Sequence, residues 1–271
     1  METHSRHQAA SLTDVSQYVL LLVGEACSDL LSPKALAHLA ATSYQILAVL
    51  RPKLNNLRDF RAELKALCAK ERFRTHVSSL AEVEMLTWEG VGLAPFEVNV
   101  LGRLLHSTPL PHLLELRLES IQVDDESFAA LMQGLNKGAL ASLEILNLAN
   151  NQIGDEGMKA FSSALSSGAL ASLNLLALEE NQIGDTGMIA FADAIKPTDE
   201  FPMGALGILT LVYLNNNTIG DEGMQAFSSA IASASLPKLK MLFVEGNPGN
   251  IVGVKEACEV RGIRCYVLRL G

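Results

Sequence analysis

The chain has 271 residues and a formal net charge of −9, with 49% hydrophobic and 19% charged residues. This length and apolar content supply a sizeable core and exclude a chain that is disordered throughout. Residues 112–271 hold 19 acidic and 10 basic residues, and since nucleic-acid binding gains from Lys and Arg releasing phosphate counterions, no nucleic-acid partner is expected there.

Three helices are predicted in the N-terminal part, over residues 14–29, 33–50 and 52–72. The second helix begins at Ser32-Pro33, which is typical of a helix start, and Pro52 separates it from the third. The sequence therefore predicts a small all-α region at this end of the chain.

No membrane span or signal peptide is expected. The apolar run 19–23 lies between Asp14 and Glu25, lacks a basic start, and is shorter than the roughly twenty residues that a span requires. These features favour a cytoplasmic or nuclear protein. The cysteines form no C-x-x-C pair and lie among apolar residues, so reduced core thiols are expected rather than disulfides or a metal site. They are Cys27, Cys68, Cys258 and Cys265.

The apolar run 19–23 is followed by L-S-P-K-A-L-A-H-L-A-A-T-S at residues 31–43. Together these segments resemble an F-box, the helical motif that docks on a Skp-type adaptor of a cullin ubiquitin ligase. The resemblance implies that five residues face the adaptor or pack beneath it: Leu20, Leu22, Pro33, Leu36 and Leu39. Alternatively, the helices only cover the apolar end of the domain that follows, because leucines at helical spacing also form a core.

An internal repeat dominates the rest of the chain. The sequence GALASLEILNLANNQIGDEGMKAFSSAL begins at Gly138, and GALASLNLLALEENQIGDTGMIAFADAI begins at Gly168. Both contain the pattern L-x-x-L-x-L-x-x-N-x-I. Strong or weaker copies of it start at Leu113, Leu143, Leu173, Leu209 and Leu239. The interval before the fourth copy is longer, and we expect an inserted loop around residues 196–202, where two prolines bracket an acidic stretch.

With this pattern the chain resembles the leucine-rich repeat proteins over residues 113–271, and the long period followed by I-G-D-E-G-M-x-A-F is similar to the ribonuclease-inhibitor type. The resemblance implies an α/β solenoid, with a curved parallel sheet inside and helices outside. We place a helical region at residues 1–79 and the solenoid at residues 80–271. A degenerate opening repeat is expected at Leu80, Val83 and Met85, with Trp88 in the asparagine position.

The residues of one copy predict the same local structure. Leu146 and Leu148 alternate with outward residues, which is the period of a strand with one buried face. Asn151 follows, and its amide is expected to satisfy backbone groups that leave the strand.

A helix is predicted to follow this turn. We expect Asp155 to cap it and Gly168 to end it. Its inward stripe is Met158, Phe161 and Leu165. Such a unit cannot cover its own apolar face, so the copies are expected to stack, with the strands on the concave side.

The outward strand positions are candidates for binding because the fold does not need them. The central outward column is Arg117, Asn147, Ala177, Tyr213 and Phe243. The column before it is Glu115, Ile145, Leu175, Leu211 and Met241, and the one after it is Glu119, Ala149, Glu179, Asn215 and Glu245. Aromatic and aliphatic side chains rimmed by carboxylates resemble the centre of a protein interface, with Tyr213 and Phe243 as expected hot spots.

The alternative for these columns is a structural role. Leu211, Met241 and Phe243 would then cover a neighbouring element, such as a C-terminal cap at Ile263–Leu268, and bind no partner.

No catalytic motif is found, and no cofactor or metal is expected. The sequence therefore predicts a non-catalytic protein-interaction module. If the F-box resemblance holds, the module is the substrate-recognition subunit of a cullin-type ubiquitin ligase. The repeats also resemble those of activators of small GTPases and of actin-capping proteins, so a regulator of either kind, or a structural subunit of a larger assembly, stays open.

Overall fold

The computed structural model describes residues 59, 62, 63, 66, 82–88, 93, 95–107, 110–133, 135 and 140–266. These residues hold seven three-residue strands: β1 (Met85–Thr87), β2 (Glu115–Arg117), β3 (Ile145–Asn147), β4 (Leu175–Ala177), β5 (Leu211–Tyr213), β6 (Met241–Phe243) and β7 (Arg264–Tyr266). The helices are α4 (Pro95–Ser107), α5 (Asp125–Gln133), α6 (Asp155–Ser166), α7 (Asp185–Ala194), α8 (Asp221–Ala232) and α9 (Val252–Val260).

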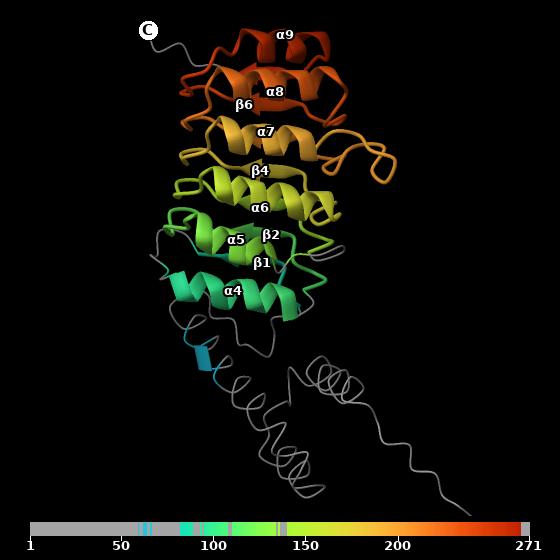
Figure 1. Cartoon of the computed structure of the whole chain (residues 1–271). Helices are drawn as coiled ribbons and strands as arrows, with labels where there is room; N and C mark the ends of the chain where they lie inside the picture. The colour runs from blue at the N-terminus through green and yellow to red at the C-terminus, as the bar shows by residue number, and fades with distance from the viewer. Residues whose placement is uncertain are drawn as a thin grey trace, which may run out of the picture.

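The strands form one parallel sheet in the order of the chain, from β1 to β7. A helix follows each of the first six strands, and Figure 1 shows these helices stacked as a layer in front of the sheet. The sheet is open, with β1 and β7 at its edges. The predicted α/β solenoid is therefore confirmed. Among the described residues, no helix is both long and apolar enough to cross a membrane.

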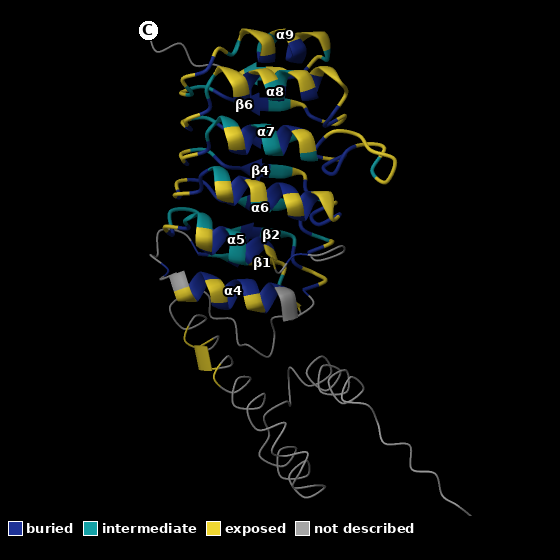
Figure 2. Cartoon of the chain, viewed as in Figure 1, coloured by how far each residue is buried: buried dark blue, intermediate teal, exposed yellow. Residues whose placement is uncertain are grey.

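The core lies between the sheet and the helices. The middle residue of each of the first six strands is buried, as are the inward sides of the helices (Figure 2). Four phenylalanines, one from each of α5 to α8, form a row through the core with ring centroids 6.0, 6.1 and 6.2 Å apart: Phe128, Phe161, Phe191 and Phe227. The predicted stripe of Met158, Phe161 and Leu165 is fully buried. Gly168 follows α6 with a φ of +83°, which agrees with its predicted role in ending the helix.

The predicted asparagines form a ladder of side chains along the turns. The Nδ2 group of Asn151 donates to the carbonyl oxygens of Leu118, Leu148 and Ala149, at 2.8, 2.9 and 3.1 Å. Its Oδ1 accepts from the backbone N–H groups of Ile121 and Val123. Asn181, Asn217 and Asn247 repeat this arrangement in the copies that follow. The ladder joins each repeat to the one before it, and the prediction that the Asn151 amide satisfies backbone groups at the turn is confirmed.

The prediction that Asp155 caps its own helix is wrong. The residue before α6 is Gly154, and the N–H groups of Gly154 and Gly157 donate to the Oδ1 of Asp125 in the preceding repeat. Asp155 is the first residue inside the helix, and its Oδ1 instead accepts from the N–H groups of Gly184 and Gly187 in the next repeat, both at 2.8 Å. A Cβ atom at position 187 would lie 2.7 Å from this oxygen. The recurring D-x-G spacing therefore leaves room for a carboxylate from the preceding repeat.

Asp155→Ala is expected to lower the free energy of unfolding by about 1–3 kcal/mol, because two N–H groups at the start of α7 lose a charged acceptor. The matched control is Glu156→Ala, since Glu156 is an exposed residue of the same helix and pairs with Lys159 on the surface. Urea unfolding of both variants measures the difference. Equal midpoints for the two variants would contradict a stabilising role for Asp155.

The opening repeat is shifted from its predicted register. Leu86 pairs with Leu116, so Leu86 takes the middle inward position of β1. Met85, which was expected to point inward, is 44% exposed. Trp88 is 2% exposed and was expected in the asparagine position, but it lies in the core instead. Side chains alternate along a strand, so the pairing of Leu86 turns Met85 outward and Trp88 inward.

The inserted loop is confirmed, since residues 196–200 are exposed, and Figure 1 shows this loop projecting beside α7. At the C-terminal end, Cys258 is buried and Cys265 is half-buried, and both are free thiols. Cys27, Cys68 and almost all of the predicted N-terminal helices lie outside the described residues, as does the boundary predicted after residue 79.

Candidate protein-binding face

The outward side chains of the strands share the sheet face opposite the helices, which we call the concave face. Strand pairing aligns them in columns because each strand meets its neighbour residue by residue. The central column is Thr87, Arg117, Asn147, Ala177, Tyr213, Phe243 and Tyr266. The column before it is Met85, Glu115, Ile145, Leu175, Leu211, Met241 and Arg264. The structure thus brings the predicted outward strand residues together.

Three aromatic rings form a stack at one end of the central column. The ring centroids of Tyr213 and Phe243 are 4.6 Å apart with planes at 15°, and those of Phe243 and Tyr266 are 4.5 Å apart with planes at 6°. Adjacent strands in a sheet are about 4.8 Å apart, so rings at paired positions stack face to face. We call Tyr213, Phe243 and Tyr266 the aromatic stack.

Sequence analysis missed Tyr266 because β7 belongs to no copy of the repeat pattern. The alternation of outward residues from Arg264 to Tyr266 is the only signal that could have found it. β7 pairs beside β6 and extends the sheet, and its Tyr266 lies within the predicted cap at 263–268 and stacks on the ring of Phe243. Tyr266 is 39% exposed, and Tyr213 and Phe243 are half-buried. Phe243 thus contacts the C-terminal segment, as the structural alternative expects, while the exposed parts of the three rings agree with the binding prediction, and both stay predictions.

Not every predicted outward residue is accessible. Ala149 and Ala177 are both 4% exposed, so these two positions offer a partner almost no surface. Ile145, Leu175, Leu211 and Met241 are half-buried and keep part of their apolar surface on the face. A methyl side chain ends below the larger side chains of the same face, which is why the alanines are covered.

The column after the central one carries carboxylates along the face. Glu119, Glu179 and Glu245 follow β2, β4 and β6, and all three are half-buried. Glu119 accepts a hydrogen bond of 3.0 Å from the Nδ2 group of Asn147. The Oε2 of Glu179 and the Oδ1 of Asn215 are buried without a hydrogen-bond partner in the described part of the chain. Two acceptors on this face therefore lack a donor.

Burial raises the pKa of the Glu179 carboxyl above its ordinary value, and the nearby carboxylates of Glu119 and Glu180 raise it further. A hydrogen bond from the backbone N–H of Glu179 itself offsets part of this effect. The charge on Glu179 is thus poorly compensated in the free chain, and a cation beside it would be favoured.

At the other end of the face, Arg117 is already paired. Its Nη2 lies 2.9 Å from the Oε2 of Glu115, and its Nε donates to the same oxygen at 3.0 Å. Arg117 is one of the predicted partner-binding residues of the central outward column. Its charge is instead directed along the face to Glu115.

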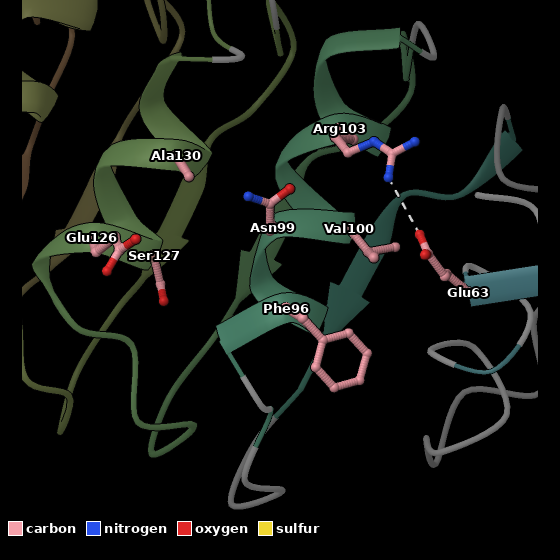
Figure 3. Close-up of a pocket in the computed structure, with 8 residues that line it drawn as sticks. All are labelled: Glu63, Phe96, Asn99, Val100, Arg103, Glu126, Ser127 and Ala130. Carbon is pink, nitrogen blue, oxygen red and sulfur yellow. Dashed lines mark hydrogen bonds and ion pairs between the residues drawn. The ribbon is translucent and has the colours of Figure 1, made fainter. Parts of the chain in front are cut away.

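The helix layer holds a separate pocket of about 380 Å³ that sequence analysis did not single out. Figure 3 shows it between α4 and α5, with Arg103 Nη1 lying 3.3 Å from Glu63 Oε2. Its lining residues are Glu63, Phe96, Asn99, Val100, Arg103, Glu126, Ser127 and Ala130. No group of three or more His, Cys, Asp or Glu in the described residues could hold a metal ion. The predicted adaptor-docking residues, from Leu20 to Leu39, lie outside the described part of the chain.

Glu179→Gln is expected to increase the free energy of unfolding at neutral pH. A carboxyl whose pKa is raised by folding binds more protons in the folded chain than in the unfolded chain, so stability falls as the pH rises from 4.5 through the raised pKa. Glutamine carries no charge, so the variant should not show this loss of stability with rising pH. Urea unfolding at several pH values tests it, with Glu222→Gln on the exposed side of α8 as the control. Parallel pH profiles for wild type and Glu179→Gln would contradict the prediction.

Comparison with known proteins identifies the repeats. Residues 139–162, 169–192 and 209–228 match the family described as Leucine Rich repeat. No curated protein matches the chain. Among solved structures, a TLR13–ssRNA13 complex is similar at 17% identity and a TM-score of 0.33, over 65% of this chain and 21% of that one. An internalin (inlF) from Listeria monocytogenes is similar at 16% identity and a TM-score of 0.21, over 77% of this chain and 91% of that one. The chain thus spans about a fifth of the matched TLR13 chain.

Proposed function

Because the chain carries leucine-rich repeats, we propose that it is a non-catalytic protein-interaction module that binds its partner on the concave face. The observation that supports this most is the aromatic stack, which places three large rings on neighbouring strands at positions that the core does not use. Large aromatic side chains dominate the binding energy of protein interfaces.

The surroundings of the aromatic stack have the composition of an interface. Leu211 and Met241 lie beside it on the same strands and keep apolar surface on the face. Asn215 and Glu245 border it on the other side. An apolar centre with a polar border is the usual anatomy of a protein-binding surface. The face thus offers a patch where a partner can exclude water.

We further propose that the module serves as the substrate-recognition subunit of a cullin-type ubiquitin ligase. This rests on the F-box-like sequence of residues 19–43. The N-terminal residues would hold a Skp-type adaptor while the concave face holds a substrate. Function would then be proximity, since tethering raises the effective concentration of the substrate's lysines near the ligase.

The test uses the full chain with purified Skp-type adaptor and cullin, and with substrates recovered by mass spectrometry. Leu36→Asp should abolish adaptor capture and leave substrate binding intact. Tyr213→Ala should leave adaptor capture intact. It should weaken substrate binding by about 30-fold or more, since a hot spot is worth about 2 kcal/mol. The control is Phe96→Ala, which removes an aromatic ring that is 63% exposed on the helix layer.

The two proposals fail in different ways. If the wild-type chain captures no adaptor, the ligase role is wrong while the interaction module stands, and a regulator of a GTPase or of actin becomes the next candidate. If Tyr213→Ala and Phe96→Ala behave alike toward every recovered protein, the concave face is not the binding surface.

A further inference from the structure

We infer that the partner binds the concave face through a segment that carries an apolar side chain and, a few residues away, an arginine or lysine. The apolar side chain would lie on the aromatic stack, and the basic side chain would lie at Glu179. This inference rests on the proposed function and specifies the chemistry of the partner.

The apolar half follows from the aromatic stack and its neighbours. Tyr213 and Phe243 lie against each other face to face, so their ring edges remain for a partner. Leu211 and Met241 extend this surface along the preceding column. These side chains offer little for a polar group to bond with, and water released from them favours an apolar side chain.

The basic half follows from the charges that share the face. Glu119, Glu179 and Glu245 occupy equivalent positions after β2, β4 and β6. Of the two basic residues in the outward columns of the strands, Arg117 is held by Glu115, and Arg264 lies on the edge strand β7. The middle of the face thus has an excess of negative charge. An acidic segment would be repelled there, whereas a basic one is attracted.

Two hydrogen-bond acceptors without a donor indicate where on the face the partner's basic side chain would lie. The Oε2 of Glu179 and the Oδ1 of Asn215 have no donor among the described residues and almost no accessible surface, so a basic group of a partner reaches Oε2 when the half-buried Glu179 side chain turns outward. When Glu179 is ionised, both atoms can only accept hydrogen bonds. The group that would satisfy them is therefore a hydrogen-bond donor. A guanidinium or ammonium group supplies several N–H donors together with the opposite charge.

The distance between the apolar and the acidic part of the face sets the distance between the apolar and the basic side chain of the partner. Tyr213 and Asn215 lie two residues apart on β5 and its extension, and Glu179 holds the position beside Asn215, because Ala177 pairs with Tyr213. Side chains at such positions are about 7 Å apart. An extended segment of a partner that runs along β5 would therefore hold its apolar and basic side chains about two residues apart.

The probe for this inference is a display library of random peptides, selected on the immobilised full chain and then on the Tyr213→Ala variant to remove peptides that bind elsewhere. The expected result is enrichment of arginine or lysine close to an aromatic or aliphatic residue. A synthetic peptide with the enriched sequence should bind Glu179→Gln about tenfold more weakly than wild type, because a charged pair is lost. Glu222→Gln, which makes the same change on α8, should bind it as wild type does.

The outcomes separate this inference from the proposed function. Enriched peptides that need Tyr213 but lack a basic residue, or that bind Glu179→Gln as tightly as wild type, would overturn the inference and leave the binding face in place. A selection that yields no peptide dependent on Tyr213 would overturn both. Thermal unfolding of Glu179→Gln beside wild type shows whether the variant is folded, and Glu179→Asp, which keeps the charge, should recover part of the affinity.

Discussion

Asn181→Ala is expected to lower the free energy of unfolding by about 3–5 kcal/mol. The Asn181 side chain is 7% exposed. Its Nδ2 donates to the carbonyl oxygens of Leu148, Leu178 and Glu179, at 2.9, 3.1 and 3.1 Å. Its Oδ1 accepts from the backbone N–H of Ile153 at 3.0 Å. One amide thus connects two repeats through four hydrogen bonds.

The substitution does not affect the four backbone groups that bond to Asn181 equally. The carbonyl of Leu148 also accepts from Asn151, that of Leu178 from Asn217, and that of Glu179 from the N–H of Asn150. The Ile153 N–H is the group left without its acceptor, and Ile153 is fully buried. A buried donor without a partner costs about 1–3 kcal/mol, and each of the other lost bonds adds about 0.5–1.5 kcal/mol.

Gln182→Ala is the matched control, because it removes an amide from the next residue, which is exposed. Urea unfolding of the two variants compares the midpoints and the slopes. A midpoint for Asn181→Ala within error of that for Gln182→Ala would mean that the ladder contributes little to stability. Asn181→Asp is expected to destabilise the chain at least as much as Asn181→Ala at neutral pH, because it buries a charged oxygen against the carbonyl oxygens that Nδ2 contacts.

The ladder and the strand columns could be predicted from the sequence because their causes are local. The alternation of Leu146 and Leu148 sets which side chains face the core, and the repeat period sets which residues meet across strands. Asp155 shows the limit of this reasoning. Its spacing from Asn151 indicates a helix start, but only the packing of two repeats shows that its carboxylate reaches Gly184 and Gly187.

The candidate site could be predicted only in part, for a similar reason. Tyr213 and Phe243 lie in clear copies of the repeat, whereas Tyr266 lies on a strand that follows α9 without the pattern. The burial of Ala177 depends on how far neighbouring side chains extend over it, which alternation alone does not give. The raised pKa of Glu179 likewise arises from burial and from Glu119 in a different repeat.

Phe191→Ala is expected to lower the free energy of unfolding by about 3–5 kcal/mol, the usual cost of removing a buried phenylalanine ring. Phe191 is fully buried in α7, and its ring lies 6.1 Å from that of Phe161 and 6.2 Å from that of Phe227. The substitution leaves a cavity and removes aromatic contacts on both sides. Phe191→Leu refills most of the volume and should cost less.

The variant should also weaken the link between the two halves of the solenoid. A repeat protein is stabilised largely by contacts between adjacent units, so a cavity in α7 removes contacts that α6 and α8 both use. Hydrogen exchange should show faster exchange of amides in α6, α7 and α8, with little change in α4. Phe96→Ala on the exposed side of α4 is the control and should leave the pattern unchanged. Faster exchange confined to α7 would show that the row of phenylalanines in the core fills space without coupling the repeats.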